Sequence, residues 1–323
     1  MDIPKVSVII PVYNTEAYVE ESLRCIINQT LRDIEIIVVN DGSTDKSLDI
    51  INNLVKEDNR IHIINQQNQG PAVARNTGIT NATGEYVYFM DSDDKLEKES
   101  LNECYIKCKK NQLDLVIFDA DIFFEDKNDL NSLRLNYSRK NNIEDTIYSG
   151  HDIFNILIDN HTFRTPLWLN FFKLDILNDK NLRFHPGLRY HDDELFTTKL
   201  FLESERVGYI PKAFFKRRIR KGSIMTSQYS LRNLSDYYNV AEQLLIFSDK
   251  KNIKTKTLIN KYIEIMLNAA VYRAHTLRLS ERIQILITCL KSYRKYVSIR
   301  TMFVLMFKYF LMNKNNSCPQ KNK

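Results

Sequence analysis

The chain has 323 residues, enough for one large domain with an extension or for two domains, and its 43% hydrophobic and 11% aromatic content excludes a disordered chain. Residues 1–211 carry 35 acidic against 23 basic residues, whereas residues 212–323 carry 23 basic against five acidic ones. The basic part therefore faces something anionic, which is nucleic acid, a phosphorylated substrate or a membrane surface.

Apolar strand patterns alternate with helical patterns through the first part of the chain. Strands are predicted at residues 5–11, 34–40, 60–64, 86–90, 113–118 and 207–210. This alternation predicts an α/β fold with a mostly parallel sheet flanked by helices. In such sheets ligands bind beyond the carboxyl ends of the strands, and Tyr13, Asp41 and Asp91 all follow predicted strands.

Three carboxylates, Asp91, Asp93 and Asp94, follow the fourth predicted strand. Like charges this close repel one another, so we expect compensation, most commonly by a divalent cation because hard oxygen ligands suit Mg²⁺ or Mn²⁺. An acidic turn that caps the next helix is the alternative. A second acidic pair, Asp192 and Asp193, lies at the start of another predicted helix.

Two acidic segments and a basic loop, predicted at residues 215–224, suit a reaction with a diphosphate leaving group. A divalent ion and arginine or lysine side chains neutralise the leaving group, and a carboxylate takes the proton of an attacking hydroxyl. A helix N-terminus favours the ionised form of that carboxylate. The chain has neither a G-x-G-x-x-G motif nor a Walker loop, which disfavours an ordinary dinucleotide or P-loop site.

Four segments resemble, in order and spacing, the successive blocks of family 2 glycosyltransferases: residues 8–14 (VIIPVYN), 38–45 (VVNDGSTD), 70–79 (GPAVARNTGI) and 89–94 (FMDSDD). The resemblance covers about residues 4–225. It implies a GT-A (Rossmann-like) fold and inverting, metal-dependent transfer from a nucleotide diphosphate sugar, in most members a UDP-sugar.

By position, the resemblance also implies a nucleotide-binding set, consisting of Pro11, Val12, Tyr13, Asp41, Arg75, Asp91 and Ser92. Within this set, Asp41 is expected to accept a hydrogen bond from the uracil ring, and Asp91 to lie near the ribose. Asp93 is the implied ligand of a Mn²⁺ or Mg²⁺ cofactor. Arg220 resembles a basic position that contacts the donor phosphates.

Residues 190–196 (YHDDELF) resemble the family segment in which the aspartate of a Glu-Asp pair is the catalytic base. Here Asp192 replaces the glutamate, so position favours Asp193 as the base and leaves Asp192 as the alternative. His191 either binds the acceptor or orients its loop. Trp168 either lines an acceptor groove or belongs to the core.

We expect a glycosyltransferase domain at residues 1–225, with a nucleotide-binding half (1–95) and an acceptor half (96–225), followed by a basic helical extension (226–323). The apolar run near residues 302–312 is interrupted by Lys308 and is too short to span a bilayer, which takes about 20 residues. The extension either lies on an anionic membrane or caps the catalytic domain. Nucleic-acid binding is not expected, because no reader motif is present.

These features predict an enzyme that extends a surface polysaccharide or a lipid-linked oligosaccharide. No signal-peptide pattern precedes residues 5–11 and the five cysteines are scattered, so we expect a cytoplasmic protein, free or peripheral on the inner face of the membrane. One alternative is a non-catalytic scaffold with the same fold at the membrane surface. The other is a sugar nucleotidyltransferase, which needs a glycine- and lysine-bearing loop where residues 11–14 stand.

Overall fold

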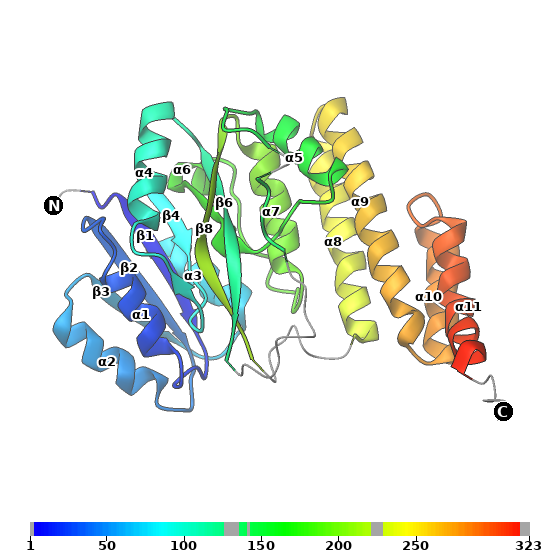
Figure 1. Ribbon diagram of the computed structural model, residues 1–323, viewed down its shortest axis with the longest axis horizontal. Coiled ribbons are helices and arrows are strands. Elements are labelled where there is room, and N and C mark those ends of the chain that lie inside the picture. Colours follow the sequence, from blue (N-terminus) through cyan, green and yellow to red (C-terminus); the bar gives the residue numbers. More distant parts are fainter. Residues whose placement is uncertain (1–2, 126–135, 141–142, 221–228, 317–323) are drawn as a thin grey trace, which may run out of the picture. The chain divides into compact units, whose positions relative to one another are not determined.

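The computed structural model describes residues 3–125, 136–140, 143–220 and 229–316, with side chains through residue 308. The chain divides into two compact units, Met1–Ser223 and Ile224–Lys323 (Figure 1). The first unit contains a β-sheet with helices packed on it, and the second is helical throughout its described part.

Within the described residues, eight strands of the first unit form one sheet in the order β3-β2-β1-β4-β7-β6-β8-β5. Their bounds are β1 (Val6–Val12), β2 (Ile34–Asp41), β3 (Ile61–Gln66), β4 (Tyr86–Phe89), β5 (Lys95–Leu96), β6 (Leu115–Phe124), β7 (Asn170–Lys173) and β8 (Val207–Ile219). Strands β3, β2, β1 and β4 are mutually parallel, whereas β7 runs antiparallel to β4 and β6. The predicted α/β fold is confirmed, with a parallel part built from the first 90 residues.

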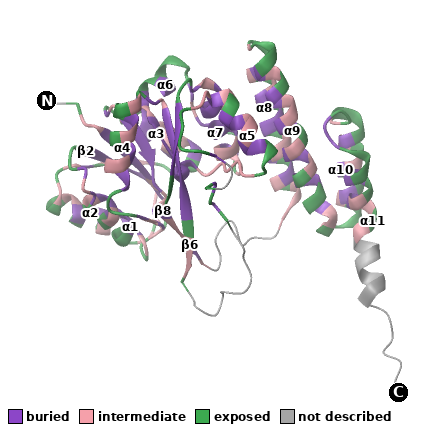
Figure 2. Ribbon diagram, turned by 45° about the horizontal axis from the view of Figure 1, so that its top comes forward, coloured by how far each residue is buried: buried purple, intermediate pink, exposed green. Residues whose placement is uncertain are grey.

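Helices cover both faces of this sheet. They are α1 (Val19–Ile27), α2 (Ser47–Glu57), α3 (Pro71–Asn81), α4 (Ser100–Asn111), α5 (Gly150–Asp159), α6 (Leu174–Asp179) and α7 (Asp192–Glu203), with the 3₁₀ turn η2 (Leu167–Leu169) before β7. Because successive strand residues point to opposite faces, Val8 and Ile10 pack toward α1, α2 and α4, whereas Ile9 meets α3. Figure 2 shows the buried strands between these helices.

An aromatic layer fixes α7 on the face that α3 also covers. Phe184 and Phe196 stack with ring centroids 4.0 Å apart, and Phe89 of β4 meets both rings edge-on. Phe172 of β7 completes the layer. Such aromatic contacts add to the free energy gained from burying the rings, so they hold the first turn of α7 near the end of β4.

The last third of the sheet differs from the sequence prediction in two places. β7 was not predicted, because its four residues lie in a mixed aromatic stretch without clear alternation. Residues 215–219, predicted as part of a basic loop, instead continue β8 beside β6. Phe215 and Ile219 are buried whereas the basic residues between them are partly exposed, so the charged side chains obscured the strand pattern. Residues 221–224 of the predicted loop lie outside the described residues.

The second unit contains α8 (Leu231–Asp249), α9 (Ile253–Arg273), the short turn η4 (Ala274–Thr276), α10 (Leu279–Ser292) and α11 (Ile299–Asn316). α9 packs on α8 and α11, and α10 packs on α11. Buried residues such as Leu244, Ile263 and Leu305 form its core. In the part of the chain that the structure describes, no helix has the length and apolarity to cross a bilayer.

Candidate functional site

The carboxyl ends of β2, β1 and β4 meet at one edge of the sheet, because these strands are adjacent and parallel. The loop after β1 lies at this edge: Val12 is buried, Pro11 is partly buried and Tyr13 is 49% exposed. Asn14 adopts a positive φ of 51°, and its side chain accepts a hydrogen bond of 2.8 Å from the backbone nitrogen of Thr44. This hydrogen bond connects the loop to the turn after β2. The exposed side chain of Tyr13 belongs to the same loop, directly before Asn14.

Asp41, the last residue of β2, is buried and is bound by the segment that leads into α3. Its Oδ1 accepts hydrogen bonds from the backbone nitrogen of Gln69 (2.9 Å) and from the side chain of Gln66 (2.7 Å), and its Oδ2 accepts from the backbone nitrogen of Gly70 (2.9 Å). A carboxylate offers about four acceptor sites. Asp41 therefore holds the start of α3 and retains capacity for one further donor.

The first acidic segment directly follows β4, and its three carboxylates have different surroundings. Asp94 is buried and accepts a 2.6 Å hydrogen bond from the backbone nitrogen of Arg218. Burial, with the negative charges of Asp93 and Asp91, raises the pKa of Asp94 to about 8. The Oδ2 atom of Asp93 accepts from Nε (3.1 Å) and Nη2 (3.0 Å) of Arg220. Protein cations and protonation thus offset the repulsion among these groups.

Ser92, the remaining residue of this segment in the predicted nucleotide-binding set, is buried between the aspartates. It presents little surface to a ligand.

The end of β8 supplies the positive charge beside these aspartates. Arg218 donates from Nε to the backbone oxygen of Asp93 (2.8 Å) and from Nη2 to Glu21 of α1. Its guanidinium also lies 4.6 Å from the ring of Phe123. Arg218 is therefore anchored in the protein and does not belong to a solvated charge run. Nothing in the sequence distinguishes Arg218 from its neighbours, because its hydrogen-bond partners Asp93 and Glu21 lie more than a hundred residues away.

The second acidic pair begins α7. His191 precedes the helix with a positive φ of 63°, and Asp192, the first helical residue, is 7% exposed. Oδ1 of Asp193 accepts a 2.9 Å hydrogen bond from the backbone nitrogen of Glu194. Burial, reinforced by the charge of Asp192, raises the pKa of Asp193 to about 6. This value lies near neutral pH, where a general base is most effective.

Arg75 of α3 joins the two acidic segments. Its Nη1 lies 2.7 Å from Oδ2 of Asp192, and its Nη2 lies 3.6 Å from Oδ1 of Asp91. The guanidinium also stands 5.5 Å from the ring of Phe184 in the aromatic layer. The planar fork of arginine suits such a two-sided contact. Residues from three distant segments are therefore brought together at the carboxyl edge of the sheet.

Trp168 does not line a groove in this structure. Its ring stacks on Phe215 with centroids 4.1 Å apart, and the residue is only 3% exposed. Tyr137 packs against the same indole edge-on. Of the two interpretations of Trp168, the contacts favour the core one, because the ring faces are covered.

The acidic residues of this site fit a divalent cation only if oxygen atoms of a bound substrate and water complete its coordination shell. Among the described side chains, no group of three or more His, Cys, Asp or Glu residues is arranged to hold a metal. Mg²⁺ is commonly bound by one or two carboxylates with substrate phosphates and water completing its shell. Asp93, whose partly exposed carboxylate is paired with the side chain of Arg220, meets that requirement.

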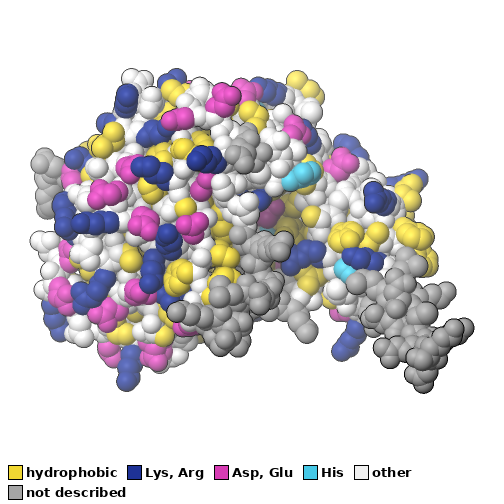
Figure 3. All heavy atoms as spheres, viewed as in Figure 1, with side chains coloured by type: hydrophobic (Ala, Val, Ile, Leu, Met, Phe, Trp, Pro, Cys, Tyr) yellow, Lys and Arg dark blue, Asp and Glu magenta, His cyan; other side chains and the backbone are white. Residues whose placement is uncertain are grey.

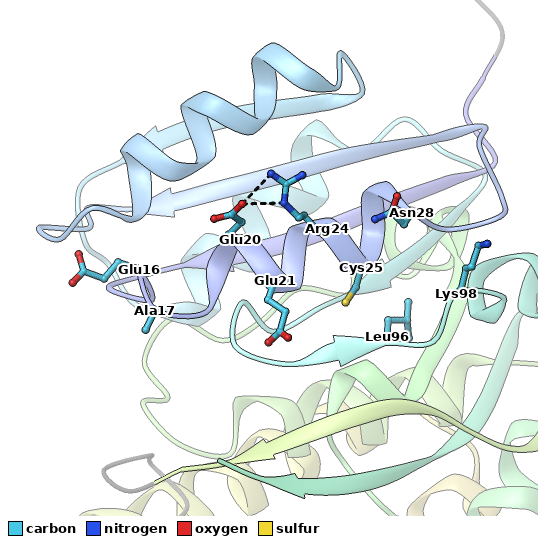
Figure 4. Close-up of a pocket in the computed structure, with 9 residues that line it drawn as sticks. All are labelled: Glu16, Ala17, Glu20, Glu21, Arg24, Cys25, Asn28, Leu96 and Lys98. Carbon is cyan, nitrogen blue, oxygen red and sulfur yellow. Dashed lines mark hydrogen bonds and ion pairs between the residues drawn. The ribbon is translucent and has the colours of Figure 1, made fainter. Parts of the chain in front are cut away.

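A cavity of about 640 Å³ lies elsewhere, along the outer side of α1 (Figure 4). Glu20 and Arg24 of α1 and Leu96 of β5 are among its lining residues. None of the residues predicted for the site lines it. This cavity is therefore separate from the residues that gather at the strand ends.

The chain is similar to known proteins over most of its length. Residues 7–169 match the family model for glycosyl transferase family 2. The glycosyltransferase GlyA of Streptococcus pneumoniae serotype 4 is 35% identical over 224 residues, which make up 68% of this chain and 31% of GlyA. The chain thus spans about a third of the length of that relative.

Two solved structures share the fold. Residues 1–349 of S. aureus TarS, in complex with UDP-GlcNAc, match with a TM-score of 0.68 at 21% identity, covering 95% of this chain and 92% of that one. The mannosyltransferase PcManGT of Pyrobaculum calidifontis, in complex with GDP-Man and Mn²⁺, matches with a TM-score of 0.57 at 18% identity, covering 98% and 89%.

Proposed function

This chain belongs to glycosyl transferase family 2, and on that premise we propose that it transfers a sugar, with inversion, from a UDP-sugar to a hydroxyl group of an acceptor. The observation that carries the proposal is the Arg75 bridge. Arg75 contacts Asp91 beside the proposed donor site and Asp192 beside the proposed base. One side chain thereby links the position of the donor to the position of the group that activates the acceptor.

For the donor, we propose that Tyr13 lies along the base and that Asp41 accepts from the uracil ring. The exposed ring of Tyr13 and the remaining acceptor capacity of Asp41 support these roles. Pro11 and Val12 shape the same loop, and Asp91 faces the ribose. The UDP-GlcNAc complex of TarS, which has the same fold, supports a uridine donor.

For the leaving group, we propose that Arg220 turns from Asp93 to the donor diphosphate. Arg220 follows the last residue of β8, and an arginine forms charge-assisted hydrogen bonds with phosphate as readily as with carboxylate. Asp93 is then the ligand for Mn²⁺ or Mg²⁺, and PcManGT with Mn²⁺ supports a metal on this fold. When bound, such an ion supplies Lewis-acid stabilisation of the departing phosphate.

For the acceptor, we propose that Asp193 is the general base. Its carboxylate takes the proton from the acceptor hydroxyl as that oxygen bonds to the anomeric carbon, while the bond from that carbon to the phosphate oxygen breaks and UDP leaves. With a pKa of about 6, Asp193 is mostly ionised at neutral pH and still basic enough to accept the proton. His191, at the start of the same helix, is a candidate contact for the acceptor.

The proposed acceptor is a glycan or a lipid-linked oligosaccharide of a surface polysaccharide, reached from the cytoplasm at the inner face of the membrane. The strongly basic C-terminal part of the chain supports an anionic or membrane-linked acceptor.

The test is release of UDP from a panel of UDP-sugars incubated with the full chain and Mn²⁺, with and without EDTA. We expect release with at least one donor and its loss in EDTA. Asp193→Asn is the matched control, because it changes a charge without changing side-chain size. Absence of metal-dependent release with every donor would favour the non-catalytic scaffold.

A further inference from the structure

Two helices of the second unit expose rows of apolar side chains. α10 exposes Leu279, Ile283, Ile287 and Leu290, and α11 exposes Ile299, Phe303 and Phe307; each is between 43% and 86% exposed. At about 100° per residue, each row occupies an arc of about 80° on its helix. We call these seven residues the α10–α11 face.

This face is additional to the one that packs the helices together. Ile285 and Cys289 of α10 and Met302 and Leu305 of α11 are buried, and they lie on a different side of each helix from the exposed rows. Soluble proteins scatter their exposed apolar residues, whereas contiguous patches mark partner or membrane sites. The α10–α11 face therefore has the character of a binding surface.

The charged residues around the face indicate what it binds. Residues 278–308 contain seven lysine or arginine residues, of which only Arg282 is buried, and a single acid, Glu281. Figure 3 shows hydrophobic and basic side chains side by side where α10 and α11 lie. A second copy of the same basic face would be repelled, whereas anionic lipid headgroups attract the lysine and arginine side chains near the surface.

We propose that the α10–α11 face lies on an anionic membrane, with its apolar side chains at the headgroup–acyl boundary and its basic side chains among the headgroups. The inference deepens the proposed function by naming the surface that meets a lipid-linked acceptor. The α10–α11 face contains none of the residues proposed for catalysis, so membrane binding is tested independently of sugar transfer.

The experiment is sedimentation of the full chain with phosphatidylcholine vesicles, with and without phosphatidylglycerol. We expect binding only to the anionic vesicles and weaker binding at high salt. Ile283→Ser combined with Phe303→Ser should weaken that binding by about tenfold or more, because both apolar side chains lose their favourable transfer. Lys291→Gln with Arg300→Gln should weaken it and reduce its salt dependence.

Ile246→Ser is the matched control, since Ile246 is a similarly exposed residue of α8, outside the face. It should bind as the unchanged chain does, and thermal unfolding should show that all variants are folded. Equal binding by the Ile283/Phe303 variant, or no binding by the unchanged chain, overturns the proposal. A dimer that the same variant dissociates, without vesicle binding, identifies a second copy as the occupant instead. Vesicle binding without UDP release would leave this inference standing while contradicting the proposed function.

Discussion

Arg75 explains why the two adjacent aspartates of α7 are not equivalent. Its guanidinium lies 2.7 Å from Asp192, so the carboxylate of Asp192 is already engaged in an ion pair. Asp193 has no such ion pair with Arg75, and burial raises its pKa to about 6. A carboxylate with a raised pKa is the better proton acceptor. The contact supports Asp193 over Asp192 as the base and gives Arg75 a positioning role beside the nucleotide contact expected for it.

We therefore expect Asp193→Asn to lower the turnover number by about 10²–10⁴-fold while leaving UDP binding close to that of the unchanged chain. Asp192→Asn removes the partner of a largely buried arginine, so its expected effect is a lower Tm with a smaller loss of turnover. UDP release, UDP titration calorimetry and thermal unfolding of both variants measure these effects. A dead Asp192→Asn enzyme beside an active Asp193→Asn enzyme would exchange the two roles.

The pH profile gives the same assignment a second readout. Because burial raises the pKa of Asp193, the carboxyl stays protonated up to about pH 6 and cannot accept a proton below that value. The kcat/KM of the unchanged chain should rise with pH through about 6 and level off above it. The residual activity of Asp193→Asn should lack this rise, and a rise that survives the substitution would belong to another group.

At the scale of elements, the placement of Arg75 depends on how closely α3 approaches β1. Gly78, one turn after Arg75, faces Ile9 of β1, and a Cβ atom at position 78 would stand 2.3 Å from Cγ2 of Ile9. Ile9 is fully buried and β-branched, so its side chain has little freedom to move. The glycine is thus needed for packing, not for an unusual backbone angle.

Gly78→Ala should lower the free energy of unfolding, because the overlap with Ile9 costs about 1–3 kcal/mol. The higher helix propensity of alanine contributes about 1 kcal/mol at most in the opposite direction. It should also reduce UDP release by shifting Arg75. Thr80→Ala, at an exposed position of the same helix, is the control and should leave Tm nearly unchanged. Thermal unfolding and UDP release test both variants; an unchanged Tm for Gly78→Ala would show that α3 can move away from β1 at little cost.

Elements were predictable from sequence where apolar alternation or continuous apolar runs were long. The runs at β1 and β2 have this character, and the start of α5 has a local signal of its own, because the side chain of the N-cap residue Ser149 accepts a hydrogen bond from the backbone nitrogen of Asp152. The end of β8 was not predictable in this way. Three basic residues separate Phe215 from Ile219, and Arg218 is held by an ion pair with Glu21 and by a hydrogen bond from its backbone nitrogen to Asp94, partners that are known only once the chain is folded.

At the scale of the molecule, the site too was predictable from sequence where it depends on local pattern, and not where it depends on tertiary contacts. The order of the motifs placed Asp41 and the first acidic segment at strand ends, which follows from local sequence pattern and from the rule that ligands bind at that edge. It did not predict that Asp41 would bind the start of α3, that Arg75 would bridge Asp91 and Asp192, or that Trp168 would be covered by Phe215. These contacts join residues 16 to 117 positions apart, and only tertiary packing determines them.

Ligand binding tests whether this edge acts as one site in the whole chain. A ligand that binds only the folded state stabilises it, by about 2.7 kcal/mol at a hundred times its dissociation constant, which corresponds to a rise in Tm of about 5–10 °C for a unit of this size. We expect UDP with Mn²⁺ to raise Tm more than UDP with EDTA does. In Asp93→Asn this metal-dependent increment should disappear, because the neutral amide is a far weaker cation ligand than the carboxylate. Asp121→Asn, which changes an exposed acid of β6, should keep the full increment. If the increment survives in Asp93→Asn, the metal is held by other oxygens and Asp93 serves only to hold Arg220.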